Sequence, residues 1–289
     1  MSKSKEIRNK IKSIRSTQKI THAMEMLSAS KMKKAQNTMR SSRPFATAII
    51  ELISNVASSC LDEHYFFVNR PEINIGLLIV GTNRGLCGGL NSVLFKKCWN
   101  YIKTWQHDHT NSLVKIATIG EKSKVFFSSK LKYDILASQE KVEEHPTIQN
   151  LIGVVQVLLQ EYKQGKIDRL YIAYNEFETT MKQQPVIKQL LPIINDSFNK
   201  QEKLPTEYLF EPSADKLLDL LLNRYLESLV YQGVIENIAC EQSARMIAMQ
   251  NATDNAAQII DDLQLHYNKE RQAIITKEVA EIVSGSSAV

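Results

Sequence analysis

Residues 234–284 have the sequence VIENIACEQSARMIAMQNATDNAAQIIDDLQLHYNKERQAIITKEVAEIVS. The segment contains neither proline nor glycine, and its apolar residues recur at steps of three and four, from Ile235 and Ile238 to Ile259 and Leu263. This spacing is that of one face of an α-helix. The sequence therefore predicts an uninterrupted helix at the C-terminal end of the chain.

The predicted helix begins well before residue 234. No proline follows Pro212, and Ser213 is a residue type that favours a helix start. A helix from Ala214 to Val283 would be about 105 Å long at the standard rise per residue. No compact core of a 289-residue chain has that length, so part of the helix must project and must be covered by something else.

The N-terminal segment is the counterpart of this helix. Residues 1–43 also lack proline and glycine, and Ile7, Ile11 and Ile14 open a helical apolar pattern whose stripe shifts along the segment. Pro44 permits a kink, after which the pattern resumes from Phe45. The sequence predicts a second long helix here.

The two ends carry opposite charge. Residues 1–45 contain 12 Lys/Arg and 2 Asp/Glu, whereas residues 214–285 contain 6 and 11, so the net charge of +5 comes from a basic and an acidic end around a neutral middle. Two long helices of opposite charge are most simply paired with each other. We expect residues 1–59 and 213–289 to form an antiparallel coiled-coil shaft.

The middle, residues 60–212, alternates between strand and helix patterns. Expected strands are 73–80, 113–119, 133–137, 170–177 and 186–191, and expected helices are 92–105, 121–129 and 147–162. Strands separated by helices imply crossover connections and a mostly parallel sheet. The predicted fold class is α/β, with a Rossmann-like domain attached to the paired helices.

A glycine-rich turn, Gly81 to Gly89, follows the first expected strand. It matches neither GxxxxGK[ST] nor GxGxxG, and the first lysine after it is Lys96, so phosphate binding is weakly supported. Glycines for a tight turn and close helix packing explain the segment better, with Cys87 as a small packed residue. The alternative is an α/β nucleotide-binding enzyme with helical extensions.

Other site chemistries find little support. The four cysteines lack CxxC spacing, and the six histidines do not form a ligand set. No Ser/His/Asp constellation is recognisable. We expect no catalytic residue, no metal and no cofactor in this chain. The basic helix contains a single aromatic residue in its first 60 positions, Phe45, which argues against nucleic acid as a partner.

Several short runs spread over the whole chain resemble the γ subunit of F-type ATP synthases. They are Lys5-Glu6-Ile7-Arg8, Thr17-Gln18-Lys19-Ile20-Thr21, Ala23-Met24-Glu25-Met26, Ser30-Lys31-Met32, Arg84-Gly85-Leu86-Cys87-Gly88-Gly89-Leu90-Asn91, Tyr231-Gln232-Gly233, Glu241-Gln242-Ser243-Ala244-Arg245-Met246, Ala252-Thr253-Asp254-Asn255, Tyr267-Asn268-Lys269, Arg271-Gln272-Ala273-Ile274 and Glu281-Ile282-Val283-Ser284-Gly285.

The resemblance implies a central rotor stalk that couples rotation of a proton-driven membrane ring to ATP synthesis in surrounding subunits. The implied partners are the hexamer of alpha and beta subunits, the epsilon subunit and the c-ring. The resemblance also implies that this subunit has no active site of its own. Members of the family lie peripherally on the membrane that holds the ring.

The resemblance also assigns contact residues. Met24 and Lys31 match positions that meet acidic segments of the catalytic subunits, and Arg245, Gln272 and Thr276 match positions that bind their loops. In each case a purely structural reading stays open: seam packing for Met24, a solvated face for Lys31, and an ion pair with Glu241 for Arg245.

At the opposite end, Tyr208, Phe210 and Glu211 match the segment that meets the membrane ring and epsilon. Tyr208 and Phe210 would equally suit the buried side of a last strand. The chain shows neither an organelle leader nor an inserted cysteine pair, so we expect the bacterial type, on the cytoplasmic face of the inner membrane.

Overall fold

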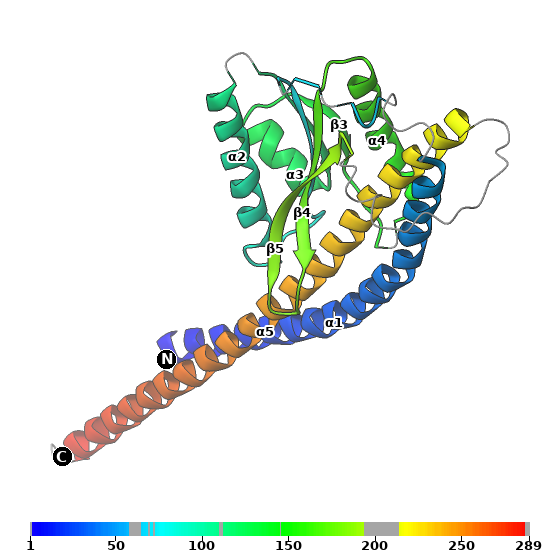
Figure 1. Ribbon diagram of the computed structural model, residues 1–289. Coiled ribbons are helices and arrows are strands. Elements are labelled where there is room, and N and C mark those ends of the chain that lie inside the picture. The colour runs from blue at the N-terminus through cyan, green and yellow to red at the C-terminus, as the bar shows by residue number, and fades with distance from the viewer. Residues whose placement is uncertain are drawn as a thin grey trace. The chain divides into compact units, whose positions relative to one another are not determined.

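The computed structural model describes residues 2–57, 65–68, 70–71, 73–109, 112–144, 146–193 and 214–286. Within these ranges the chain forms one five-stranded sheet, two long terminal helices and shorter helices on the sheet (Figure 1). The predicted contact residues Tyr208, Phe210 and Glu211 lie outside the described residues.

The sheet has the strand order β3-β2-β1-β4-β5. Strands β1 (Ile75–Val80), β2 (Val114–Ile119), β3 (Ile135–Gln139) and β4 (Arg169–Phe177) are parallel. β5 (Gln183–Leu191) returns from β4 as an antiparallel hairpin. The predicted mostly parallel sheet is confirmed.

Both faces of the sheet are covered, as the continuous apolar run of β1 predicts. One face packs against α2 (Leu90–Asp108), against the short α3 (Glu121–Lys124) and against the π-helical turn Val125–Lys130, with Phe95, Ile102 and Phe127 buried. The other face packs against α4 (Ile148–Lys163) and against parts of both terminal helices.

The terminal helices are α1 (Ser2–Ala57) and α5 (Ala214–Ser286). Pro44 lies inside α1, which continues through it without ending. Ile49 and Ile53 of α1 share a core with Leu218 and Leu222 of α5, whereas Thr21 contacts Thr253. Low numbers on one helix face high numbers on the other, so the predicted antiparallel pairing is confirmed.

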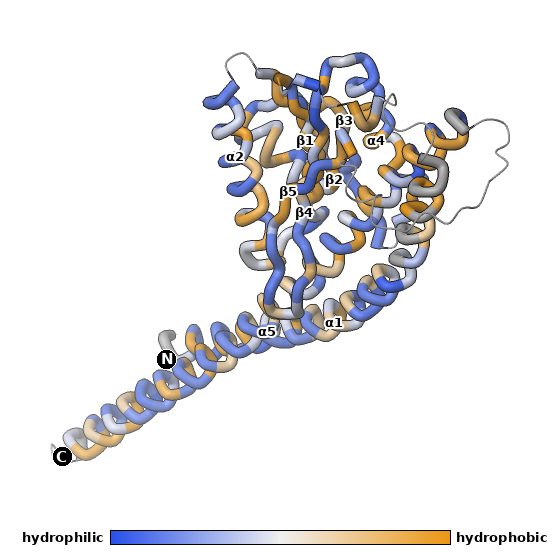
Figure 2. Tube along the Cα trace, in the orientation of Figure 1, coloured by the Kyte–Doolittle hydropathy of each residue, from blue (hydrophilic) through white to orange (hydrophobic). Residues whose placement is uncertain are grey.

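The chain divides into two compact units, each held by its own contacts. The first, the sheet unit, comprises residues 30–244 and contains the sheet together with the adjoining parts of α1 and α5. The second, the outer unit, comprises residues 1–29 and 245–289 and contains the remaining parts of the two helices. Figure 2 shows apolar and polar residues alternating along both helices.

One glycine fixes the turn between β2 and α3. Gly120 has φ +94°, a backbone conformation that side chains disfavour. A Cβ placed on it would lie 2.6 Å from the carbonyl oxygen of Gly81, while its N–H donates to the Gln139 carbonyl at 2.8 Å. The turn therefore brings the ends of β1, β2 and β3 together only with glycine at this position.

Candidate functional site

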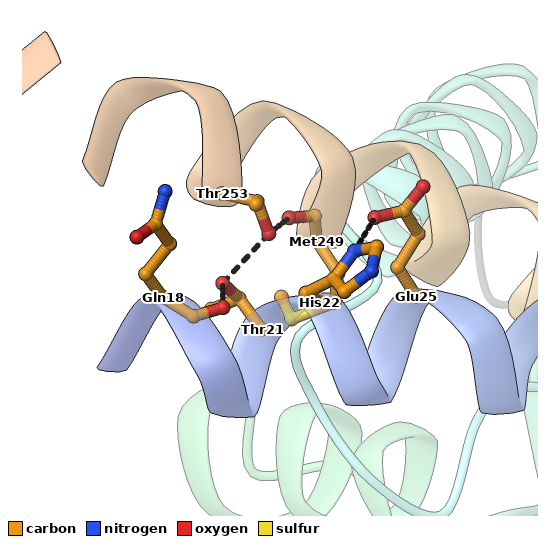
Figure 3. Close-up of polar contacts among 6 residues, drawn as sticks. All are labelled: Gln18, Thr21, His22, Glu25, Met249 and Thr253. Carbon is orange, nitrogen blue, oxygen red and sulfur yellow. Dashed lines mark hydrogen bonds and ion pairs between the residues drawn. The ribbon is translucent and has the colours of Figure 1, made fainter. Parts of the chain in front are cut away.

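Two threonines connect the helices of the outer unit. The hydroxyl oxygens of Thr21 and Thr253 are 2.7 Å apart (Figure 3). Each hydroxyl also lies within hydrogen-bond distance of a carbonyl of its own helix, that of Gln18 at 3.0 Å and that of Met249 at 2.9 Å. Because each hydroxyl has one proton, one donates across the pair and the other donates to its own helix.

The apolar part of this seam is narrow. Ile11 on α1 and Met249, Ala256 and Ile260 on α5 are buried, at steps of seven and four along α5. Most neighbouring positions are exposed or half-buried. Such a seam holds two helices together over a small area and leaves much of both helix surfaces available to other chains.

The predicted contact residues of the outer unit differ in accessibility. Met24 is half-buried, three residues beyond Thr21 on α1. Gln272 and Thr276 are exposed and one helical turn apart, so they share a face of α5. Arg245 is buried, with 9% of its surface exposed. The structure thus presents Gln272 and Thr276 to solvent and holds Arg245 against the chain itself.

Lys31, the remaining predicted contact residue on α1, belongs to the sheet unit and is paired. Its ammonium group forms an ion pair with Glu144, in the segment between β3 and α4. Asn83 holds that segment by accepting from the Val142 N–H at 3.2 Å and donating to the Val142 carbonyl at 2.5 Å. Lys34, Ile238 and Gln242 line the same small depression. Sequence reasoning missed Glu144 because its partner lies 113 positions away and no spacing links the two.

The glycine-rich turn uses its polar side chains internally. The Thr82 hydroxyl donates to the Arg84 carbonyl at 2.7 Å and accepts from the Asn91 side-chain amide at 2.7 Å. Gly88 has φ +58°, a backbone conformation that favours glycine. Cys87 is buried against Leu90 and Cys240. These contacts are those expected for a tight turn that packs a helix closely.

The cysteines of the described residues, Cys87, Cys98 and Cys240, are all buried. Burial raises the pKa of the Cys98 thiol to about 12 and also raises that of Cys240. Thiols of this kind are poor nucleophiles at neutral pH. Among the described residues no group of three or more His, Cys, Asp or Glu side chains is arranged to hold a metal ion.

Known proteins resemble the chain over its full length. The sequence profile described as ATP synthase matches residues 3–289. The ATP synthase gamma chain of Nitrosococcus oceani is 49% identical over 292 residues, and that of Coxiella burnetii is 50% identical, each alignment covering all of both chains. The chain belongs to the ATP synthase gamma chain family. The family expected from the sequence is confirmed.

Chains in solved structures of mitochondrial ATP synthases share the fold. A chain of the Euglena gracilis mitochondrial ATP synthase rotor matches 95% of this chain and 99% of its own length, with a TM-score of 0.64 at 18% identity. A chain from the Tetrahymena thermophila mitochondrial ATP synthase, central stalk and c-ring, matches 81% and 99%, with a TM-score of 0.60 at 22% identity. At this identity the likeness concerns the fold.

Membership in the gamma chain family agrees with a non-catalytic subunit, and it leads to a direct test. The isolated chain is expected to show no measurable ATPase activity and to bind MgATP weakly, because the glycine-rich turn lacks the lysine that a phosphate loop needs. Equilibrium binding of MgATP and a coupled hydrolysis assay measure both properties. Saturable micromolar binding that disappears in Gly85→Ala or Gly88→Ala would contradict the assignment of this turn.

Proposed function

We propose that the chain is the central rotor stalk of a bacterial F-type ATP synthase. Residues 1–59 and 213–289 form its shaft, and residues 60–212 form its foot. The observation that carries the proposal is the full-length identity of about half to bacterial proteins named ATP synthase gamma chain. Rotation of a proton-driven membrane ring turns the foot, and the shaft changes the conformations of the catalytic subunits.

The exposed end of α5 supports a shaft that other subunits surround. Residues 271–284 are exposed except Ile274. The exposed positions include Ile275, Val279 and Ile282, which follow one another at steps of four and three and so share a face of the helix. Exposed apolar stripes mark interaction surfaces. In the proposed assembly the alpha and beta subunits enclose this face.

The proposed contacts with the catalytic subunits lie at two levels. Arg245 and Gln272 are 27 residues apart on α5, or about 40 Å at the standard rise, so they meet different parts of the surrounding subunits. Gln272 and Thr276 are exposed, whereas only 9% of the surface of Arg245 is exposed. Met24 and Lys31 on α1 make a second set of contacts with acidic segments.

The shaft works through unequal contacts. A bound partner shifts a conformational equilibrium only by the difference in its interaction free energy with the alternative states. One asymmetric pair of helices facing three equivalent catalytic subunits supplies such a difference to each in turn. Contacts that are individually weak, such as single hydrogen bonds of about 1 kcal/mol, allow the shaft to leave each subunit again.

At the foot, Tyr208, Phe210 and Glu211 are proposed to contact the epsilon subunit and the c-ring. The complex would place this chain on the cytoplasmic face of the inner membrane as a peripheral protein that takes part in proton transport. No helix in the described ranges has an apolar stretch long enough to cross a bilayer. Attachment to the membrane would therefore use the ring.

The composition of the purified complex tests the proposal. A tagged chain expressed in its own cell should copurify at one copy per three alpha and three beta subunits, together with epsilon and the ring. Quantitative mass spectrometry of the detergent-solubilised complex measures this ratio. Recovery of the chain alone, or as a scaffold with unrelated proteins, would overturn the rotor assignment.

The two contact levels predict a larger loss in a double variant than in either single variant. Gln272→Ala removes one polar contact of about 1 kcal/mol from an exposed position, so the subunit should fold normally and turnover should fall about fivefold at most. Arg245→Ala should lower turnover and also destabilise the chain, because this side chain is buried. The double variant should turn over more slowly than either single variant. ATP hydrolysis by reconstituted complexes measures turnover, and wild-type rates in all three variants would contradict these assignments.

A further inference from the structure

The sheet loses its regular hydrogen-bond pattern at Asn175, near the end of β4. Its neighbour on β5 is Pro185, but the N–H and carbonyl of Asn175 both point to the side opposite β5. On that side, pairing with β1 ends two residues earlier, at Ile79 and Ala173, and β1 itself ends at Val80. Asn175 is nevertheless buried, with 1% of its surface exposed. Its backbone groups therefore need partners from outside the sheet.

Helix α5 supplies those partners. The side-chain oxygen of Asn237 accepts from the Asn175 backbone N–H at 3.4 Å and from its side-chain amide at 2.9 Å. The Cys240 thiol donates to the Asn175 carbonyl, with Sγ and O 3.2 Å apart. The Asn237 amide also donates to the Gly81 carbonyl at 3.1 Å, just beyond β1. Side chains of α5 thus continue the hydrogen bonding of two strands.

A third contact follows one turn further along α5. The Ser243 hydroxyl donates to the Thr180 carbonyl at 2.5 Å and lies 3.4 Å from the side-chain amide of Gln183, which donates to it. Thr180 belongs to the turn between β4 and β5, and Gln183 begins β5. Asn237, Cys240 and Ser243 are spaced by three, so they form one row along α5.

The hydrogen bonds of this row are shielded from water and depend on the direction of the helix side chains. Asn237 is 1% exposed, and Cys240 and Ser243 are fully buried. Burial raises the pKa of the Cys240 thiol, and the carboxylates of Glu236 and Glu176 raise it further, so the sulfur keeps the proton that it donates. Apolar contacts are non-directional, whereas hydrogen bonds weaken steeply when their angles change. Buried polar groups of this kind can fix the register of packed helices.

One helical turn before Asn237, the same face of α5 also lies close to the sheet. A Cβ on Gly233 would be 3.1 Å from the Ile172 side chain and 3.3 Å from that of Tyr174, so glycine permits the approach. The sheet unit ends at Ala244, so Ser243 is its second-to-last residue. The row therefore holds α5 at the point where the helix leaves the sheet unit.

We propose that Asn237, Cys240 and Ser243 form a torsional anchor, the place where rotation of the sheet unit is transmitted to α5. A slide of α5 by one residue, about 1.5 Å with a turn of about 100°, breaks every hydrogen bond of the row at once. The apolar surface of the same interface tolerates small rotations better. The anchor rests on the rotor function proposed above and assigns positioning roles to residues that contact no other subunit.

Proton pumping against a load tests the anchor. Complexes carrying Asn237→Ala or Ser243→Ala are reconstituted into vesicles, and ATP hydrolysis and proton uptake are measured together, with and without a preformed opposing proton gradient. Protons pumped per ATP should fall at least about twofold against the gradient and stay near wild type without it. Ser243→Ala removes one hydroxyl only and serves if Asn237→Ala fails to assemble.

The matched control is Asn223→Ala. Asn223 is an asparagine of α5 whose amide donates to the Asp219 carbonyl of the same helix at 2.7 Å, without reaching the sheet. Complexes with Asn223→Ala should pump as many protons per ATP against the gradient as the wild type. Anchor variants that match the control, or a control that falls as far as they do, overturn the anchor. Wild-type complexes that neither hydrolyse nor pump would instead refute the rotor function.

Discussion

Replacing Met24 with lysine is expected to uncouple ATP hydrolysis from proton pumping. Met24 is half-buried on the basic helix α1, and the proposed partner at this level is an acidic segment of a catalytic subunit. An added ammonium group would gain about 1 kcal/mol from an ion pair there, and so prolong one contact about fivefold. Protons pumped per ATP in reconstituted vesicles should fall by a similar factor, while the folded chain keeps its stability.

Salt and a neighbouring variant make the test specific. Exposed ion pairs weaken with ionic strength, so raising salt should restore the coupling of Met24→Lys. Met26→Lys is the control. Met26 is exposed on the same helix two residues away, so this substitution introduces the same charge on a different face. If Met24→Lys and Met26→Lys keep the wild-type ratio at low salt, Met24 does not make the proposed contact.

Gly120→Ala is expected to destabilise the sheet unit strongly. The residue has φ +94°, and an alanine Cβ would lie 2.6 Å from the backbone oxygen of Gly81, which cannot move without shifting the end of β1. Backbone strain of this kind costs roughly 1–3 kcal/mol, and the close contact adds to it. Denaturant unfolding of the isolated chain should show a loss of about 3 kcal/mol or more.

Gly153→Ala provides the matched control in the same unit. Gly153 lies inside α4, is exposed, and has open space where a Cβ would be placed. Alanine in a helix interior is favoured over glycine by about 1 kcal/mol, so this variant should be slightly more stable than the wild type. A midpoint for Gly120→Ala at or above that of the wild type would show that the turn adapts to a side chain.

The parts of the fold that were predictable from the sequence are those with a local signal. The apolar periodicity and the absence of proline predicted α5 from Ala214 onwards, and the structure has it from Ala214 to Ser286. The apolar run around Leu77 predicted a strand buried on both faces. The helical pattern was predicted to resume after Pro44, and α1 does run through Pro44 to Ala57, because a long helix packed on a core can bear one missing hydrogen bond.

The parts that sequence reasoning missed depend on contacts between distant residues. Nothing near Asn237 indicates that its amide bonds with Asn175, 62 positions earlier, because a single asparagine in a helix is usually solvated. The ion pair of Lys31 with Glu144 is similar. Among the proposed contacts with other subunits, Gln272 and Thr276 came from the resemblance alone, since a face covered only in an assembly resembles any solvated face of a single chain.

The pairing of the two chain ends has a consequence for synthesis. Ile49 and Ile53 of α1 share a core with Leu218 and Leu222 of α5, so a helix made early in synthesis packs against one made much later. At roughly 5–20 residues per second, α1 waits on the order of 10–50 s until α5 has been made. During that time its apolar stripe is open to chaperones and to other nascent chains. A ribosome that stops before α5 releases a product in which this part of α1 cannot be buried.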